Sequence, residues 1–279
     1  MNTAPELGTR PSPPDAPTGR RRIPLRSLAA RPHACSKDVR LQVLQGVDLF
    51  RDLTADQLTA VNAEMIAHTW DEDAPLYRAG DRADHLYILA SGRAKAFRST
   101  ADGQDVVVDF LAPGDLFGDL EILGRSQHTE TVQALTNVCA LQIGTREFRE
   151  ILTQQPRVAL RVLHAVSIQL ALARSSVTKQ STATVAERVA AVLLWLAEKF
   201  GEPGATGTLI EIPLSRADLA SITGSTTASV SRVMSGLRKD GVIDSGRRWT
   251  EILDHRRLRA LASQEMAPAT RPGAAPTPD

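Results

Sequence analysis

The sequence predicts an α+β protein in which a β-rich unit, a long helix and a compact helical unit follow one another. Three observations predict this order. Short apolar runs separated by glycine turns fill the first half of the chain, and an apolar stretch without glycine or proline follows at 157–179. Two short helical patterns separated by a tight turn occur near the C-terminus. A length of 279 residues accommodates two folded units.

The composition is that of an ordinary globular chain with no overall electrostatic preference. Hydrophobic residues make up 42% of it, and the formal net charge is +1, so any basic surface must be local. Cys35 and Cys139 lack the paired spacing of a zinc site or a secreted disulfide framework, which favours a reducing cytoplasm. No stretch approaches the roughly 20 apolar residues that span a bilayer, so we expect no membrane partner.

Turn signals divide the segment from Asp48 to about Thr145 into short apolar runs. These signals are Ala79-Gly80-Asp81, Ser91-Gly92, Asp102-Gly103 and Pro113-Gly114-Asp115. Short strands at regular spacing predict a compact antiparallel β-roll or barrel.

The apolar stretch 157–179 predicts a long helix that must be covered on more than one side. We expect the β-rich unit to cover one side and a second copy of the same helix to cover another. A core helix within a single monomer is the alternative.

The C-terminal unit begins with two helix starts. Thr184-Val-Ala-Glu187 has the spacing of a capping box, and Ser215-Arg-Ala-Asp218 begins another helix. Residues 201–207 are expected to form a loop before a short strand. Thr223-Gly224-Ser225 then separates two helical patterns, as in a helix-turn-helix, and a basic hairpin after them predicts a wing.

The second of these helices has the pattern of a DNA recognition helix. Its apolar residues recur at helical spacing, while small hydroxylated residues and Arg232 are left outward, where they could approach base edges in a major groove. The residues expected at the DNA are Ser215, Arg216, Ser225, Thr226, Thr227, Ser229, Ser231, Arg232, Arg238, Lys239, Arg247 and Arg248. The alternative for the arginines is a mixed, solvated surface.

The order of β-roll, long helix and winged helix-turn-helix resembles the CRP/FNR family of bacterial transcription regulators. The segments that carry the resemblance are LYILASGRAKAF, ADGQDVVVDFLAPGDLFGDL, AERVAAVLLWLA and LSRADLASITGSTTASVSRVMSGLRKDGVI. The resemblance implies a homodimer joined along the long helix that binds a palindromic operator in double-stranded DNA and contacts RNA polymerase. It also implies that the roll is of the cyclic-nucleotide-binding type and acts as a sensor.

The resemblance divides the chain into five segments. Residues 1–36 and 263–279 are expected to be disordered tails, 37–155 the sensor, 156–183 the dimerisation helix and 184–262 the DNA-binding domain.

Two departures from the family pattern bear on ligand and operator. The effector pocket implied by the resemblance would comprise Gly118, Asp119, Leu120, Arg125, His128, Thr129 and Arg174. In cyclic-AMP-responsive members an Arg-Ser pair after a Gly-Glu-Leu turn holds the cyclic phosphate, whereas here the turn is Gly118-Asp119-Leu120 and the later stretch reads Gln127-His128-Thr129-Glu130. A carboxylate where a guanidinium would neutralise the phosphate is unfavourable, so cyclic AMP is not the expected effector, and the signal is unidentified. Arg125 or Arg174 could recruit another anion, or the roll could bind no small ligand.

Ala228 stands where many members carry a glutamate, so the operator should differ from the family consensus.

Cys139 and Cys35 occupy places similar to cluster ligands of the FNR branch. Four thiolates normally hold a [4Fe-4S] cluster and the chain has two cysteines, so the full cysteine cluster is lacking. Such a cluster is not expected unless a residue such as His33 substitutes, and no cofactor is predicted. A thiol or disulfide switch through both cysteines remains open beside the simpler interpretation of Cys139 as a small buried hydrophobe.

Two other function classes account for the sequence less well. The chain lacks GxSxG, P-loop and HExxH motifs, so an enzyme is not predicted. A cyclic-nucleotide-binding module that regulates another protein would leave the helix-turn-helix unexplained. The sequence therefore predicts a cytoplasmic, homodimeric DNA-binding transcription regulator.

Overall fold

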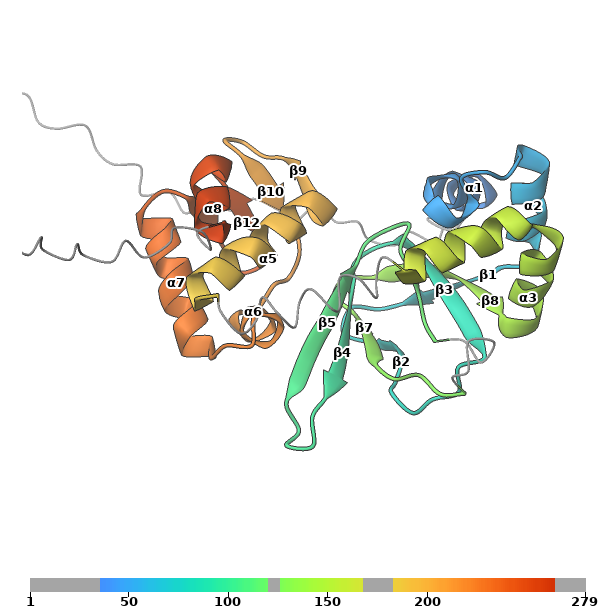
Figure 1. Cartoon of the computed structure of the whole chain (residues 1–279), viewed down its shortest axis with the longest axis horizontal. Helices are drawn as coiled ribbons and strands as arrows, with labels where there is room; N and C mark the ends of the chain where they lie inside the picture. Colours follow the sequence, from blue (N-terminus) through green and yellow to red (C-terminus); the bar gives the residue numbers. More distant parts are fainter. Residues whose placement is uncertain (1–35, 120–125, 168–182, 264–279) are drawn as a thin grey trace, which may run out of the picture.

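The computed structural model describes residues 36–119, 126–167 and 183–263, and its elements form a sheet-containing unit and a smaller helical unit (Figure 1). The predicted α+β order of roll, helix and winged helix-turn-helix is confirmed. Both predicted tails lie outside the described residues, apart from Ser36 and Ser263, and so does 168–182 of the long helix.

The chain enters the first unit through helices that the sequence pattern did not predict. They are α1 (Lys37–Gly46), the 3₁₀ helix η1 (Asp48–Phe50) and α2 (Ala55–Ala63). The expectation of strands from Asp48 onward was wrong for this segment. Thr54 caps α2 by accepting a hydrogen bond from the Gln57 amide, and the Gln57 side chain accepts one from the Thr54 amide. This capping box was the signal that could have identified the helix.

Two four-stranded sheets form the roll. The strands are β1 (Ile66–Trp70), β2 (Pro75–Tyr77), β3 (His85–Ser91), β4 (Ala94–Ser99), β5 (Asp105–Leu111), β6 (Leu116–Phe117), β7 (Thr131–Ala134) and β8 (Val138–Gly144). Their orders are β1-β8-β3-β6 and β2-β7-β4-β5, with antiparallel pairing throughout. Leu89, Val132 and Ala140 belong to one buried cluster formed from both sheets.

A second buried cluster joins the other face of one sheet to the surrounding helices. Helix α3 (Thr145–Gln154) contributes Phe148, and the following helical residues 156–167 contribute Val158. The opposite side of this last helix carries Leu160 and Leu163, which are 67% and 63% exposed. Within helical residues 156–167, one side is therefore covered by the sensor, as predicted, and another side is exposed to solvent in the single chain.

The C-terminal unit consists of four helices and a small sheet among the described residues. The elements are α5 (Val185–Phe200), β9 (Gly201–Pro203), β10 (Thr208–Ile210), α6 (Arg216–Ile222), α7 (Thr227–Lys239), β11 (Ile243–Ser245), β12 (Thr250–Ile252) and α8 (His255–Ala262). The sheet order is β11-β12-β10-β9. The expected loop at 201–207 was wrong in part, because β9 pairs with β10. An edge strand tolerates Pro203, which has no amide hydrogen to donate.

The two units share one hydrophobic core. Val107, Phe110 and Leu135 of the roll belong to the same buried cluster as Leu193 and Leu196 of α5. Polar contacts also join the two units: Lys199 Nζ lies 3.2 Å from Asp109 and 2.9 Å from Asp115. The recognition helix is thus attached to the sensor by a packed interface as well as by the chain.

We expect Gly92→Ala to destabilise the roll strongly. Gly92 has φ +89°, and a Cβ there would lie 2.3 Å from the Asn137 carbonyl oxygen. The clash with backbone adds to the left-handed strain of about 1–2 kcal/mol. Urea titration of the free energy of unfolding measures the loss.

Gly103→Ala is the matched control. Gly103 also has positive φ, but no heavy atom outside its immediate chain neighbours lies within 4 Å of the position that an alanine Cβ would take. It should show only the strain of about 1–2 kcal/mol. Equal losses in the two variants would contradict the steric account of Gly92.

Candidate nucleic-acid interface and sensor site

The turn before α7 is built by its own hydroxyl groups. Thr226 is the N-cap of α7, and its Oγ1 accepts a hydrogen bond from the Ser229 amide at 3.2 Å. Gly224 makes the preceding turn with φ +56°. These small polar residues, which are poor helix formers inside a helix, are suited to its first turn.

A residue that the sequence pattern did not single out holds this turn in place. Arg188 of α5 donates from Nε to the Thr223 carbonyl oxygen at 2.7 Å and from Nη2 to the Ser225 hydroxyl at 3.2 Å. Ser225 in turn donates to the Thr223 carbonyl at 3.2 Å. Ser225 and Thr226 therefore use their hydroxyls within the turn.

The exposed edge of α7 contains Thr227, Ala228 and Arg232, whereas Ser229 and Ser231 are partly buried. Val230, Met234 and Leu237 face the core, as predicted, and Val233 packs against it. The Arg232 Nη2 lies 3.5 Å from the Ser229 hydroxyl, and no acidic residue occurs in the first turn of the helix. The helix N-terminus therefore keeps its positive dipole end for an anion.

Predicted phosphate-binding residues surround a cleft of about 470 Å³ beside the wing, the hairpin formed by β11 and β12. The cleft is lined by Glu72, Pro213, Leu214, Ser215, Arg216, Gly246, Arg247 and Arg248. Burial, and then the nearby charge of Arg238, lowers the pKa of the Arg216 guanidinium. An anion in this cleft would stabilise the charge of this partly buried guanidinium.

Two of the predicted basic residues already have acidic partners. Arg238 Nε lies 3.2 Å from Asp244 on β11. Arg248 places Nη1 2.9 Å and Nη2 3.0 Å from the two carboxylate oxygens of Glu72, which lies just after β1 in the sensor. Arg232, Lys239 and Arg247 are exposed. Sequence reasoning could not identify Glu72, because the pair joins residues 176 positions apart.

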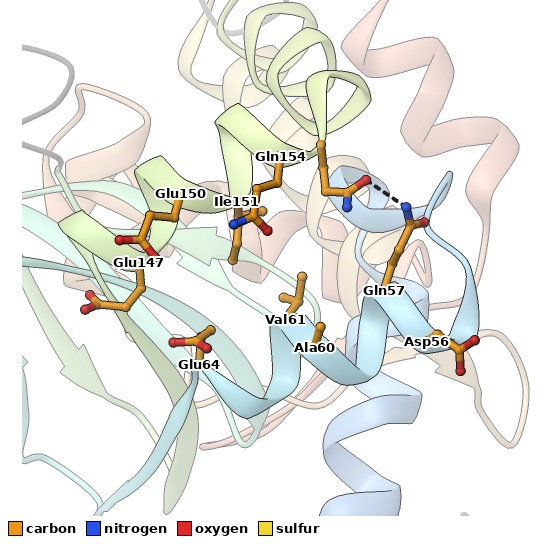
Figure 2. A pocket seen from close by; sticks show the side chains of 10 residues that line it. Asp56, Gln57, Ala60, Val61, Glu64, Glu147, Glu150, Ile151 and Gln154 are labelled. Carbon is orange, nitrogen blue, oxygen red and sulfur yellow. Dashed lines mark hydrogen bonds between the residues drawn. The ribbon is translucent and has the colours of Figure 1, made fainter.

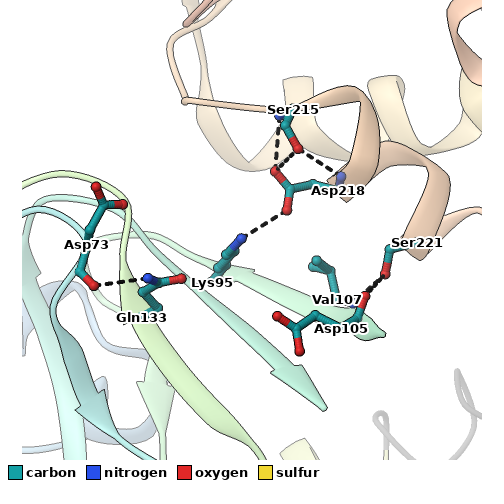
Figure 3. A network of polar contacts seen from close by, with 8 residues as sticks. All are labelled: Asp73, Lys95, Asp105, Val107, Gln133, Ser215, Asp218 and Ser221. Atoms are coloured by element: carbon teal, nitrogen blue, oxygen red, sulfur yellow. Dashed lines mark hydrogen bonds and ion pairs between the residues drawn. The ribbon is translucent and has the colours of Figure 1, made fainter. Parts of the chain in front are cut away.

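Ser215, which is predicted to contact DNA, also caps helix α6. Its hydroxyl accepts from the Asp218 amide at 2.9 Å and donates to Asp218 Oδ2 at 2.6 Å, which caps α6. The other oxygen, Asp218 Oδ1, accepts from Lys95 Nζ of β4 at 3.0 Å (Figure 3). Helix α6 is therefore fixed both to its own first turn and to the sensor.

The structure brings together four members of the predicted effector pocket. Asp119 Oδ2 accepts from the Thr129 amide at 2.7 Å and from its hydroxyl at 3.1 Å, while the Asp119 amide donates to His128 Nδ1 at 3.2 Å. Gly118 lies beside them with φ +107°. Leu120, Arg125 and Arg174 lie outside the described residues. The Asp119 carboxylate thus joins the turn after β6 to the segment before β7.

Aromatic side chains pack inside the roll next to the Asp119 carboxylate. The His128 ring stacks on Tyr77 with centroids 3.7 Å apart, and Phe117 stacks with Tyr87 at 5.4 Å. Burial lowers the pKa of His128, which as a neutral ring accepts at Nδ1. The carboxylates of Asp119, Asp81 and Asp84 act on the His128 ring, and those of Glu130 and Asp119 act on Tyr77, so aromatic rings and acidic groups lie together here.

Cys139 is fully buried in β8, and the structure records its sulfur in a disulfide. Its strand neighbours across the sheet are Thr69 and Ser91. Cys35, the other cysteine, lies outside the described residues.

A further groove of about 340 Å³ lies between α2 and α3 (Figure 2). Glu64, Glu147 and Glu150 line it, and Gln57 Nε2 donates to Gln155 Oε1 at 2.8 Å at one end. Its carboxylates have the wrong sign for a nucleic acid, so it is not part of the DNA interface. Over the described ranges, no group of three or more metal-binding side chains occurs, and no helix there has the length and apolar character to cross a membrane.

Comparisons with known proteins match both units. Residues 68–155 match the cyclic nucleotide-binding domain family, and 187–261 match the Crp-like helix-turn-helix domain family. The chain is 25% identical over 219 residues to the cyclic AMP receptor protein of Thermus thermophilus, covering 78% of this chain and 98% of that protein. It is 26% identical over 187 residues to the fumarate and nitrate reduction regulatory protein of Vibrio cholerae, covering 67% and 74% respectively.

A solved structure has the same fold. FixK2 from Bradyrhizobium japonicum superposes with a TM-score of 0.64 at 22% identity, covering 71% of this chain and 98% of that one. A sensor-type roll packed on a winged helix-turn-helix, matched in order by both domain families, leads to one conclusion: the chain belongs to the CRP/FNR family of transcription regulators.

Proposed function

We propose that this protein is a homodimer that binds a palindromic operator through α7 and responds to a signal other than cyclic AMP. The observation that carries the proposal is the exposed edge of α7, with Arg232 on it and the basic wing beside it. One helix fits a major groove, and a dimer would place two such helices on successive half-sites. Binding in the cytoplasm next to RNA polymerase is the setting that the family resemblance implies.

The solvent-exposed apolar side of helical residues 156–167 supports the dimer. Leu160 and Leu163 lie three residues apart, so they share one face, and Val166 on the same helix is also exposed. Exposed leucines at helical spacing favour a helix-to-helix contact with a second copy.

The choice of signal rests on the stretch 127–130, which ends in Glu130 and lacks the phosphate-binding Arg-Ser pair, and on the carboxylate of Asp119 beside it. The carboxylate accepts two hydrogen bonds from Thr129, and a phosphate near it would meet like charge. This supports a sensor that does not bind cyclic AMP at this position.

A second candidate is regulation by thiol and disulfide exchange. The observation that favours it is the disulfide recorded at Cys139, a buried position at the centre of the sheet. Reduction would remove a covalent restraint on β8, next to β1 and β3, and could alter the packing of the sensor.

Arg232→Ala should weaken operator binding by about 1–3 kcal/mol and relax the preference at one base position in each half-site. The purified protein is mixed with a random duplex library, the bound fraction is sequenced, and the selected operator is titrated. Cyclic AMP, added in a parallel titration, should leave the affinity unchanged.

Lys239→Ala is the control for Arg232. It removes the same charge from the far end of α7, where we expect a phosphate contact, so affinity should fall evenly across sequences. No enriched palindrome with the wild-type protein would count against the proposed function.

Leu163→Glu should dissociate the dimer. A buried leucine contributes about 2 kcal/mol and occurs twice in a twofold interface, so the dimer Kd should rise roughly a thousandfold. Sedimentation equilibrium measures it, and Leu163→Met, which keeps the apolar area, should behave like the wild type. An unchanged mass for Leu163→Glu would exclude this face as the interface.

If thiol and disulfide exchange is the signal, DNA affinity should differ between the oxidised and the reduced wild-type protein. Cys35→Ser should remove that difference, because it abolishes pairing of the two cysteines without placing a hydroxyl in the core at Cys139. Affinities are measured on the selected operator after dialysis against reductant or oxidant. Identical redox responses in both proteins would refute this candidate.

A further inference from the structure

The wing arginine Arg248 is already engaged by a carboxylate of the sensor. Both terminal nitrogens of its guanidinium lie within 3.0 Å of Glu72, one on each oxygen. Such a bidentate pair uses the same fork of donors that would bind a phosphate. Arg248 therefore cannot keep this geometry and contact the DNA backbone with the same two nitrogens.

Glu72 is held in position for this contact by its own segment. Its amide donates to the Asn137 side-chain oxygen at 3.0 Å, which fixes the turn after β1. Its neighbour Asp73 has a left-handed φ of 68°. Among the described residues that line the wing cleft, Glu72 is the one carboxylate, opposite Arg216, Arg247 and Arg248.

Separate contacts hold the sensor and the DNA-binding unit in the arrangement that makes the pair. Lys95 Nζ binds Asp218 at 3.0 Å, with side-chain exposures of only 19% and 10%. Ser221 of α6 accepts from the Val107 amide at 2.7 Å and donates to the Asp105 carbonyl at 3.0 Å (Figure 3). The Glu72 contact thus belongs to a packed interface, and movement of the two units relative to one another would break it.

We propose that Glu72 is an autoinhibitory residue that occupies the phosphate-binding position of Arg248 and lowers DNA affinity in this arrangement of the two units. The carboxylate competes with a DNA phosphate for the same donors and reduces the positive potential of the cleft. A rearrangement that separates β1 from the wing releases Arg248 for the backbone. This inference rests on the proposed DNA-binding function.

The test is Glu72→Gln in the full-length protein, with a fluorescent duplex of mixed sequence as the probe. Backbone contacts dominate such non-specific binding, so no operator is needed. Anisotropy titrations over a series of KCl concentrations give the Kd and its salt dependence. Glu72→Gln should bind several-fold more tightly, and its slope of log K against log salt should steepen by about 0.9 for each released arginine.

Two further variants separate the proposed contact from a general charge effect. Asp71→Asn removes the same charge one residue away and should have a much smaller effect, because no contact with Arg248 involves Asp71 in the described structure. In an Arg248→Gln background, Glu72→Gln should no longer increase affinity. Equal gains in Glu72→Gln and Asp71→Asn, or a gain that persists without Arg248, would overturn the autoinhibitory role. If neither the wild type nor Glu72→Gln bound the duplex, the proposed function itself would fail.

Discussion

The packing of strand β5 against helices α5 and α6 is the constraint on which the position of the recognition helix depends. As the last strand of its sheet, β5 has an edge whose backbone groups lack a neighbouring strand. Ser221 of α6 satisfies two of them, while Val107 and Phe110 enter the core of the DNA-binding unit. Separation of the roll from the DNA-binding unit would expose these backbone polar groups and apolar side chains at the same time. The two units are therefore expected to adopt a few discrete arrangements and not to slide continuously past one another.

Asp218 joins local helix formation to this tertiary contact. One carboxylate oxygen completes the capping box with Ser215, and the other binds Lys95 of the roll. Both partners of the ion pair are largely buried, so removal of either would leave a charge without compensation. A residue that starts a helix therefore also fixes that helix to the sensor.

The local features of the fold could be predicted because their causes lie within a few residues. The helix starts at Thr184 and Ser215 and the tight turn at Gly224 are present where the sequence predicts them, and both helix starts are capping boxes. The same kind of signal at Thr54 was available, but the short apolar runs around it were attributed to strands. The β9 strand could not be predicted, because three residues around Pro203 become a strand only through pairing with β10.

The basic residues of the candidate site could be named from the sequence, but their ion-pair partners could not. The net charge of +1 means that a few local arginines must supply the attraction to DNA. Their availability depends on acids that are distant in sequence, Glu72 for Arg248 above all, and only the folded arrangement of sensor and wing brings these together. The ion pair with Glu72 engages one of the six basic residues predicted at the DNA. In the proposed autoinhibitory role of Glu72, the geometry between the two units controls DNA affinity even where no residue of α7 moves within its own domain.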